Sequence, residues 1–325
     1  MRISHEVFLA VSKELNVSKA AQKLYITPQC ASDHIRRLER EYGTVLFERK
    51  PKFKLTAAGE IMQRSLLNIQ VLENNMNRSL HSITEGDRGT ITVGISTSRA
   101  PIILPKVLPQ YYREFPEVNV SFIEEDTQLL EDRLLLGDLD LFVGINTTPH
   151  PDYNIQTLAT EGIMLVIPDL LLRRNFDREE IAGMKEGVDL NRFSNLPFIL
   201  PSFRTGKVNH AIQEYLNYNN IQLNMIYNIS DSKTQIHLCS TGICAALCPR
   251  MLLDTPYMEN LSTHTEGGIH TFSINHFDRN IHIDLVTHKN LTPPLFMRRF
   301  IHLLQEEIPA IAEANLYKDR TSLSE

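Results

Sequence analysis

The chain has 325 residues, more than one ordinary hydrophobic core organises, and so suits two or three domains. Apolar residues make up 42% and charged residues 22%, values typical of a soluble globular protein. No apolar run of about 18 residues is present, which argues against a membrane span, and the N-terminus lacks the features of a signal peptide. Four cysteines are too few for a disulfide framework, so we expect a cytoplasmic protein.

Charge is unevenly divided along the chain. Residues 1–59 hold 11 Lys and Arg against 6 Asp and Glu, a balance of +5, whereas the remaining residues balance at −11. A small basic domain joined to a larger acidic one indicates that only the first contacts a polyanion.

Three short helices are predicted at the N-terminus. Residues 3–15 place apolar side chains on one helical face. Ser18 is a good N-cap for a second helix, and Thr27 is one for a third helix with Pro28 at its first position, where a missing N–H costs nothing. Gly43 follows the end of the third helix.

Two short helices joined by a tight turn form a helix-turn-helix, which presents the polar stripe of its second helix to the DNA major groove. In that stripe Gln29 can contact adenine, Ser32 several bases, and Arg36 guanine or phosphate. Asp33 repels phosphate, so it either reads a cytosine amino group or points away. The alternative is a plain helical hairpin with a solvated face. The DNA-contacting residues predicted here are Ser18, Thr27, Gln29, Ser32, Asp33 and Arg36.

A short hairpin is predicted next, because segments 45–49 and 52–56 can pair with each other. We expect it to be a wing beside the reading helix, with its basic residues on DNA phosphates. Those residues are Arg49, Lys50, Lys52 and Lys54.

A long helix is predicted from residue 57 to about residue 83, with an apolar seam at coiled-coil spacing that Glu73 interrupts. Such a helix cannot bury its seam alone, so we expect a second copy of the chain to cover it. The seam residues are Met62, Leu66, Ile69, Met76, Leu80 and Ile83.

Strands and helices alternate after a linker at 85–89, and this order predicts a parallel sheet. The first elements are strands at 90–96, 118–125 and 139–145, with helices at 105–115 and 127–136. A strand at 162–168 leads to a poorly patterned stretch, 169–195, and to further strands at 198–200, 224–230 and 243–247. A strand at 281–288 and a helix at 294–306 return to the first half, and the last residues from about 309 look frayed.

A set of residues between 18 and 59 follows a known pattern: Ala20-Ala21, Leu24, Thr27, Ser32, Ile35, Leu38-Glu39, Gly43, Leu46 to Arg49 and Leu55 to Gly59. With these residues the segment resembles the LysR-type transcriptional regulator family. The resemblance extends over nearly the whole chain through Gly94, Leu104-Pro105, Phe115-Pro116, Gly137 to Asp140 and Gly242 to Pro249. Three features depart from the family pattern: the order Pro28-Gln29, the acidic Asp33, and the long segment 169–197.

The resemblance implies an α/β fold: an N-terminal winged helix-turn-helix, a long linker helix, and a two-lobed periplasmic-binding-protein-like (Rossmann-like) effector domain. The lobes would be crossed near Ile167-Pro168 and around 270–274. The expected divisions are a DNA-binding domain at 1–59, a linker and dimerisation helix at 60–88, an effector-binding domain at 89–308, and a tail at 309–325. Within the effector-binding domain, lobe 1 would take 89–166 and 271–308, and lobe 2 would take 167–270.

An effector cleft is then expected between the two lobes. Hydroxyl groups and unpaired N–H groups where strands end and helices begin favour a carboxylate or another anion, although each hydroxyl is as readily an N-cap. Arg99 and Arg204 could add charge. The predicted effector-binding residues are Ser96, Thr97, Ser98, Thr127, Ser202, Phe203, Arg204 and Thr241.

Neither a metal nor another cofactor is expected. Cys239, Cys244 and Cys248 lie in an apolar stretch and suggest buried thiols more than a redox or metal site. Five histidines recur every six residues from His264 to His288, without carboxylate or cysteine companions at ligand spacing. Signatures of a P-loop, GxGxxG, GxSxG or HExxH are lacking, so no enzyme is expected.

The sequence therefore predicts a transcriptional regulator that binds double-stranded DNA and responds to a small-molecule effector. It would dimerise through the 57–83 helix and, by resemblance, form a homotetramer; RNA polymerase is a further candidate partner. A solute-binding protein or small enzyme on the same two-lobed fold is an alternative that leaves the helix-turn-helix unexplained. A DNA-architecture protein is another, but it would need no sensing domain.

Overall fold

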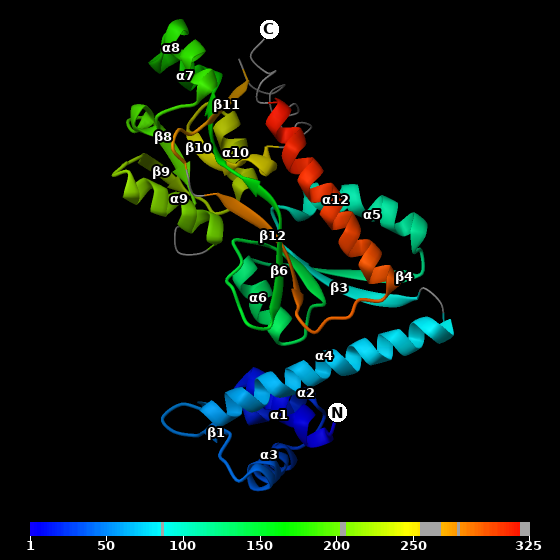
Figure 1. Ribbon diagram of the computed structural model, residues 1–325. Coiled ribbons are helices and arrows are strands. Elements are labelled where there is room, and N and C mark those ends of the chain that lie inside the picture. The colour runs from blue at the N-terminus through cyan, green and yellow to red at the C-terminus, as the bar shows by residue number, and fades with distance from the viewer. Residues whose placement is uncertain (86–87, 202–205, 254–267, 278–279, 319–325) are drawn as a thin grey trace.

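The computed structural model describes residues 1–325 except 86–87, 202–205, 254–267, 278–279 and 319–325. Three parts follow one another along the chain: a small N-terminal head, a long helix, and a larger part built from two sheets (Figure 1). None of the helices within the described ranges combines the length and apolar character needed to cross a membrane.

The head contains three helices and a two-stranded antiparallel wing. Its core is formed by buried side chains such as Phe8, Val11, Ile35 and Leu38, each of which contributes roughly 1.5–3 kcal/mol. The elements are α1 (Ile3–Glu14), α2 (Val17–Lys23), α3 (Pro28–Tyr42), β1 (Phe47–Glu48) and β2 (Lys54–Leu55).

The N-cap expected at Ser18 is wrong. Asn16 takes that position, with its side chain accepting a hydrogen bond from the Lys19 N–H at 3.1 Å, and Ser18 lies inside α2. Asn caps helices as well as Ser does, and here it comes first in the chain, with an extended backbone. Thr27 caps α3 as predicted, with its hydroxyl oxygen accepting from the Cys30 N–H at 3.1 Å.

The long helix is α4 (Ala57–Glu85). Its first turn lies directly against the head, since a side chain at Gly59 would place a Cβ only 2.2 Å from the Leu46 carbonyl oxygen. Leu66 is buried and Met62 is partly buried in the core of the head, so these two residues of the predicted seam contact their own head rather than a partner. The exposed apolar residues on α4 are Ile61, Ile69, Leu72, Met76 and Leu80.

The first sheet forms lobe 1, in the strand order β4-β3-β5-β12-β6. β3 is parallel to β4 and β5, and β12 is antiparallel to β5 and β6, which confirms the predicted strand-helix-strand-helix-strand unit. The elements are β3 (Gly89–Ile95), α5 (Ala100–Glu114), β4 (Val118–Glu124), α6 (Thr127–Leu135), β5 (Leu141–Ile145), β6 (Tyr153–Glu161), β12 (Ile281–His288) and α12 (Leu295–Lys318).

The second sheet forms lobe 2, in the strand order β11-β7-β10-β8-β9. Its strands are β7 (Ile163–Pro168), β8 (Pro197–Leu200), β9 (Asn224–Asn228), β10 (Ala245–Pro249) and β11 (Ile269–Ser273). Its helices are α7 (Asp169–Asn175), α8 (Arg178–Gly183), α9 (Lys207–Tyr218) and α10 (Ser232–Ser240), with short 3-10 turns at Met184–Glu186, Leu190–Phe193 and Arg250–Leu252. The poorly patterned stretch thus contains α7 and α8, and a capping box at Asp177 starts α8.

Two connections cross between the lobes, one between β6 and β7, around Gly162, and one between β11 and β12. The crossings expected at Ile167-Pro168 and around 270–274 are therefore displaced, because β7 (Ile163–Pro168) and β11 (Ile269–Ser273) belong wholly to the second sheet.

Two helices are longer than expected. α5 begins at Ala100, five residues before the predicted start, and continues past Pro105 because Ile103 and Val107 are buried in the core. The frayed tail expected from 309 is wrong as far as Lys318: α12 continues that far, with Ile308 fully buried and the next turn packed against the core.

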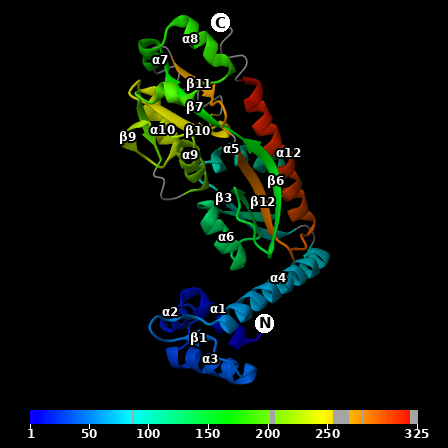
Figure 2. The ribbon, with the colours of Figure 1, turned by 60° about the vertical axis from the view of Figure 1, so that its left-hand side comes forward.

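α4 also packs against lobe 1, as the turned view shows (Figure 2). The Asn75 side-chain amide donates to the Asn290 carbonyl at 2.7 Å, and the Asn290 amide donates to the Asn68 side-chain oxygen at 3.0 Å. From the head, Lys13 Nζ reaches Asp138 Oδ1 at 2.6 Å. The orientation of the head is thereby linked to lobe 1.

Candidate DNA-binding and effector sites

The polar stripe of α3 faces solvent, as a DNA-reading surface requires. Gln29, Asp33 and Arg36 are exposed and Ser32 is half-buried, whereas Ala31, Ile35 and Leu38 are buried on the opposite side. The 3.6-residue period of the helix separates these two faces. The stripe therefore lies where the helix-turn-helix prediction placed it.

Asp33 connects two of the predicted base-reading side chains. Its carboxylate accepts from Gln29 Nε2 at 3.2 Å and lies 3.4 Å from Arg36 Nη1. These exposed contacts are weak and screened by salt, so DNA can replace them at little cost. In the protein without DNA, Asp33 therefore interacts with the side chains of Gln29 and Arg36.

The wing is anchored by aromatic rings and carries its charges outward. Phe53 stacks on Phe47 with ring centroids 4.9 Å apart. Arg49, Lys50 and Lys52 are exposed, and none of them forms an ion pair with another described residue, whereas Lys54 pairs with Glu48 at 2.9 Å. Three of the four predicted phosphate-gripping side chains are thus available to a polyanion.

A cavity of about 290 Å³ lies between the lobes, and four predicted effector residues line it: Ser96, Thr97, Ser98 and Thr127. Its walls include the first residues of α6, α9 and α10 and the loop that leads into α5. Strand ends of a parallel sheet bring helix starts to one edge, which explains why segments far apart in sequence meet here.

The hydroxyl groups of this cavity differ in their roles. Thr127 is buried and its oxygen accepts from the Ile145 N–H at 2.9 Å, which ties α6 to β5. Ser96 is buried too, and its oxygen has no hydrogen-bond partner in the described structure. Thr97 is exposed and Ser98 half-buried. Thr97 and Ser98 are therefore the predicted hydroxyl groups most open to a ligand, whereas the Ser96 hydroxyl is buried beside the cavity without a partner.

Arg99 adds no net charge, because it forms a buried ion pair with Glu161 at the end of β6. The second oxygen of Glu161 accepts from the Met251 N–H of lobe 2 at 2.6 Å. Arg99 is thus an anchor at the crossing between the lobes.

Lys207, the first residue of α9, also lines the cavity and was not predicted. A basic residue at a helix start shortly after a strand was the signal that could have found it. Asp126, Asn209, Ser230, Asp231 and Ser232 were missed as well.

The remaining predicted effector residues are Ser202, Phe203, Arg204 and Thr241. Ser202, Phe203 and Arg204 lie outside the described residues. Thr241 lies at the C-terminal end of α10, where its hydroxyl donates to the Leu238 carbonyl at 2.7 Å, whereas the cavity touches the N-terminal end of that helix.

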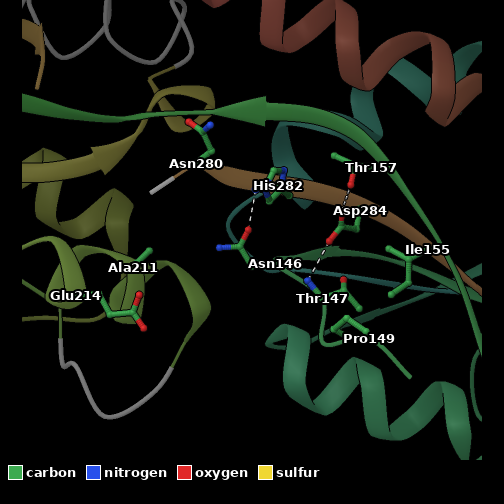
Figure 3. Close-up of a pocket in the computed structure, with 10 residues that line it drawn as sticks. All are labelled: Asn146, Thr147, Pro149, Ile155, Thr157, Ala211, Glu214, Asn280, His282 and Asp284. Carbon is green, nitrogen blue, oxygen red and sulfur yellow. Dashed lines mark hydrogen bonds between the residues drawn. The ribbon is translucent and has the colours of Figure 1, made fainter. Parts of the chain in front are cut away.

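A second cavity of about 680 Å³ lies between α9 and the ends of β5 and β12 (Figure 3). Asp284 is buried there and accepts from Thr157 Oγ1 at 2.7 Å and from the Thr147 N–H at 2.9 Å (Figure 3). The other lining residues include Asn146, Ile155, Glu214, Asn280 and His282.

The three clustered cysteines are core residues. Cys239, Cys244 and Cys248 are buried, and burial raises the pKa of all three thiols, that of Cys244 to about 11. Neutral thiols of this kind are poor nucleophiles and poor metal ligands. Within the described ranges, no group of three or more His, Cys, Asp or Glu side chains could hold a metal ion.

Comparison with known proteins gives the class. Residues 84–309 match the LysR substrate binding domain, and residues 4–60 match the bacterial regulatory helix-turn-helix protein, lysR family. The chain belongs to the LysR family of transcriptional regulators, with a DNA-binding helix-turn-helix and an effector-binding domain.

Individual relatives agree with this assignment. The chain is 28% identical to the Hca operon transcriptional activator HcaR of Escherichia coli over 266 residues, which cover 81% of this chain and 84% of the relative. Its fold is like that of a full-length OxyR variant from Pseudomonas aeruginosa (TM-score 0.63, 16% identity, 96% and 97% of the two chains). It is also like CbnR, a LysR family transcriptional regulator (TM-score 0.52, 18% identity, 95% and 98%), which has been solved with its target DNA as well.

Proposed function

We propose that this regulator senses a small organic acid, which binds in the 290 Å³ cavity between the lobes. The observation that carries the proposal is the convergence of two helix starts, several hydroxyl groups and one lysine on one cavity. α6 and α9 begin there, and neither N-cap residue, Asp126 or Gly206, has a side-chain hydrogen bond to its helix.

Uncapped helix starts favour anions for two reasons. The first N–H groups of any helix have no acceptor within the helix itself, and the helix dipole places partial positive charge at the same end. A carboxylate can satisfy several such donors at once, with each charge-assisted bond worth roughly 1.5–3 kcal/mol. The ammonium of Lys207 lies on the same wall, with the carboxylate of Glu131 3.5 Å away from it.

Two carboxylates also line the cavity, but they leave room for an anionic ligand. Asp231 is engaged in capping α10, with its oxygen accepting from the Thr234 N–H at 2.8 Å. Asp126 is exposed, where solvent screens its charge.

The DNA-binding head and the effector cavity also suggest how the protein assembles and where it acts. We propose that α4 joins two copies through its exposed apolar residues and that two such dimers form a tetramer. A change in the angle between the lobes would then alter the spacing of the heads on the operator and their contact with RNA polymerase. A DNA-binding regulator of this kind acts in the cytoplasm.

The test is thermal-shift screening of the full-length protein against sodium salts of small carboxylic acids, with the corresponding amides as controls. An acid that binds should raise the unfolding temperature, and Thr97→Val together with Ser98→Ala should remove that rise. Thr90→Val, an exposed threonine on β3 outside the cavity, is the matched control and should leave the rise intact. A rise that survives the double substitution would place the acid elsewhere.

A further inference from the structure

One side chain bridges the gap between the lobes at a distance from the crossing strands. Lys207 belongs to lobe 2, yet its Nζ donates to Thr148 Oγ1 of lobe 1 at 2.6 Å. The same Nζ lies 3.5 Å from Glu131 Oε1, on α6 of lobe 1. The contact therefore exists only while the lobes are close together.

The acceptors of Lys207 are held in place by their own lobe. Glu131 is 8% exposed, and its Oε1 accepts from the Thr148 N–H at 2.7 Å. Its backbone carbonyl accepts from the Tyr153 hydroxyl at 2.6 Å. A carboxylate fixed in this way needs little reordering to hold an ammonium group.

The position of Lys207 in its own helix requires an explanation. A cation at the first residue of a helix is unfavourable, because it faces the positive end of the helix dipole. Within lobe 2 this lysine therefore gains nothing from α9, and the favourable interactions described for it lie across the gap, on Glu131 and Thr148.

The contact also lies between the two cavities. Lys207 lines the smaller one, whereas Thr147 and Pro149, on either side of Thr148, line the larger one. On the side of the crossing strands, the Arg99–Glu161 pair joins the lobes independently. Breaking the Lys207 contact would open the gap on one side only and merge the two cavities.

We propose that Lys207, Glu131 and Thr148 form a latch that holds the two lobes closed without an effector and limits the size of ligand that fits the smaller cavity. The latch itself does not require the proposed sensing function; only its effect on which ligands fit the cavity rests on that function. An ammonium has three donors and one is used by a described residue, so an acid in the smaller cavity can share Lys207 with Thr148.

The experiment is hydrogen–deuterium exchange of the full-length protein without effector, read at residues 96–99 and 249–252. These segments lie on the smaller cavity or beside it, whereas the hydrogen bond and ion pair described for Lys207 go to Thr148 and Glu131, so loss of those two contacts reaches the segments only through movement of the lobes. Lys207→Gln removes the ammonium and Thr148→Val removes its acceptor from the other lobe. Lys106→Gln, an exposed lysine on α5, is the matched control.

Both latch variants should exchange faster at residues 96–99 and 249–252, on the order of tenfold, which corresponds to about 1.4 kcal/mol. The control should exchange as the wild type does. Wild-type rates at both segments in both latch variants would overturn the proposal. Because Thr148→Val changes no charge, it decides the matter if Lys207→Gln fails to fold, and neither result depends on an acid being found.

Discussion

The DNA-binding head and the two-lobed effector-binding domain, called the sensor domain below, use opposite arrangements of charge, and we propose that the second binds a small acid. In the head, Arg49, Lys50 and Lys52 stand exposed on the wing without ionic partners among the described residues. In the sensor domain, Arg99 is buried against Glu161, and Lys207 is held by Glu131 and Thr148.

The difference follows from the size of the ligand that each part binds. A polyanion is attracted by exposed charges, which release counterions on binding and are strongly sensitive to salt. A small acid must be enclosed, so its site needs donors in low dielectric, and any buried cation there must be paired. The comparison predicts salt-sensitive DNA binding beside nearly salt-insensitive effector binding.

The largest effect is expected from disrupting the proposed dimer contact through α4. Ile69 and Leu72 are 42% and 54% exposed on α4, so changing both to Asp should leave the fold intact and yield monomers. A monomer presents one head to a two-half-site operator, so tight binding should be lost, by roughly 100-fold or more. Sedimentation velocity and operator titration measure the two effects.

The double change Ser65→Asp, Asn77→Asp is the control for this substitution, since it adds the same two negative charges at exposed polar positions of α4. It should stay dimeric. A dimer that persists in the Ile69→Asp, Leu72→Asp variant would show that the dimer interface does not lie on this part of α4.

The next effect concerns base reading. Gln29→Ala should weaken binding to the preferred operator by about 1–3 kcal/mol and binding to random DNA very little. The reason is that an amide contributes hydrogen bonds to a base edge but no charge to the backbone. Equal losses on both DNAs, measured by fluorescence anisotropy, would show that Gln29 does not read bases.

The head could be predicted from the sequence because its signals are local. Thr27, Pro28 and Gly43 mark the two ends of α3, and the period of the apolar side chains fixes its exposed face. The error at Ser18 has the same local origin, since Asn16 offers an equally good cap slightly earlier in the chain.

The sensor cavity could be predicted only in part, because its walls come from distant segments. Ser96 and Thr127 were found by the rule that ligands gather at strand ends. The position of Lys207 at a helix start was a local signal for the cavity, but its partners, Glu131 and Thr148, lie about 60–75 residues away, and no local pattern predicts those contacts. The prediction for the seam of α4 was partly wrong for a related reason. An apolar Leu66 fits a dimer contact or the core of the head equally well, and only the folded structure shows that it belongs to the core of the head.

A smaller effect tests the salt side of the comparison. Lys52→Gln should flatten the plot of log affinity against log salt concentration by about 0.9, the contribution of one phosphate contact. Lys106→Gln, on the sensor domain, should leave that slope unchanged. An unchanged slope for Lys52→Gln, and likewise for Arg49→Gln and Lys50→Gln, would show that the wing does not contact DNA phosphates.

The smallest effect concerns the junction where the two regions meet. His288, at the end of β12, is buried, and its Nδ1 accepts from the Asn290 N–H at 3.2 Å. Asn290 in turn holds Asn75 of α4. Burial lowers the pKa of His288 below its usual 6.5, and the nearby Lys289 and His150 lower it further, against the opposing charge of Asp152.

The sign of the pH dependence follows from this lowered pKa. Below pH 6.5 the unfolded chain binds a proton that the native ring does not, so His288 makes the protein less stable as pH falls from 6.5 to the native pKa, by up to about 1.4 kcal/mol per pH unit. Above pH 6.5 it has no such effect. His288→Asn can still accept from the Asn290 N–H but cannot titrate, so its urea-unfolding free energy should fall less steeply than that of the wild type below pH 6.5. Parallel curves over that range would show that His288 is not the group that makes this junction sensitive to acid.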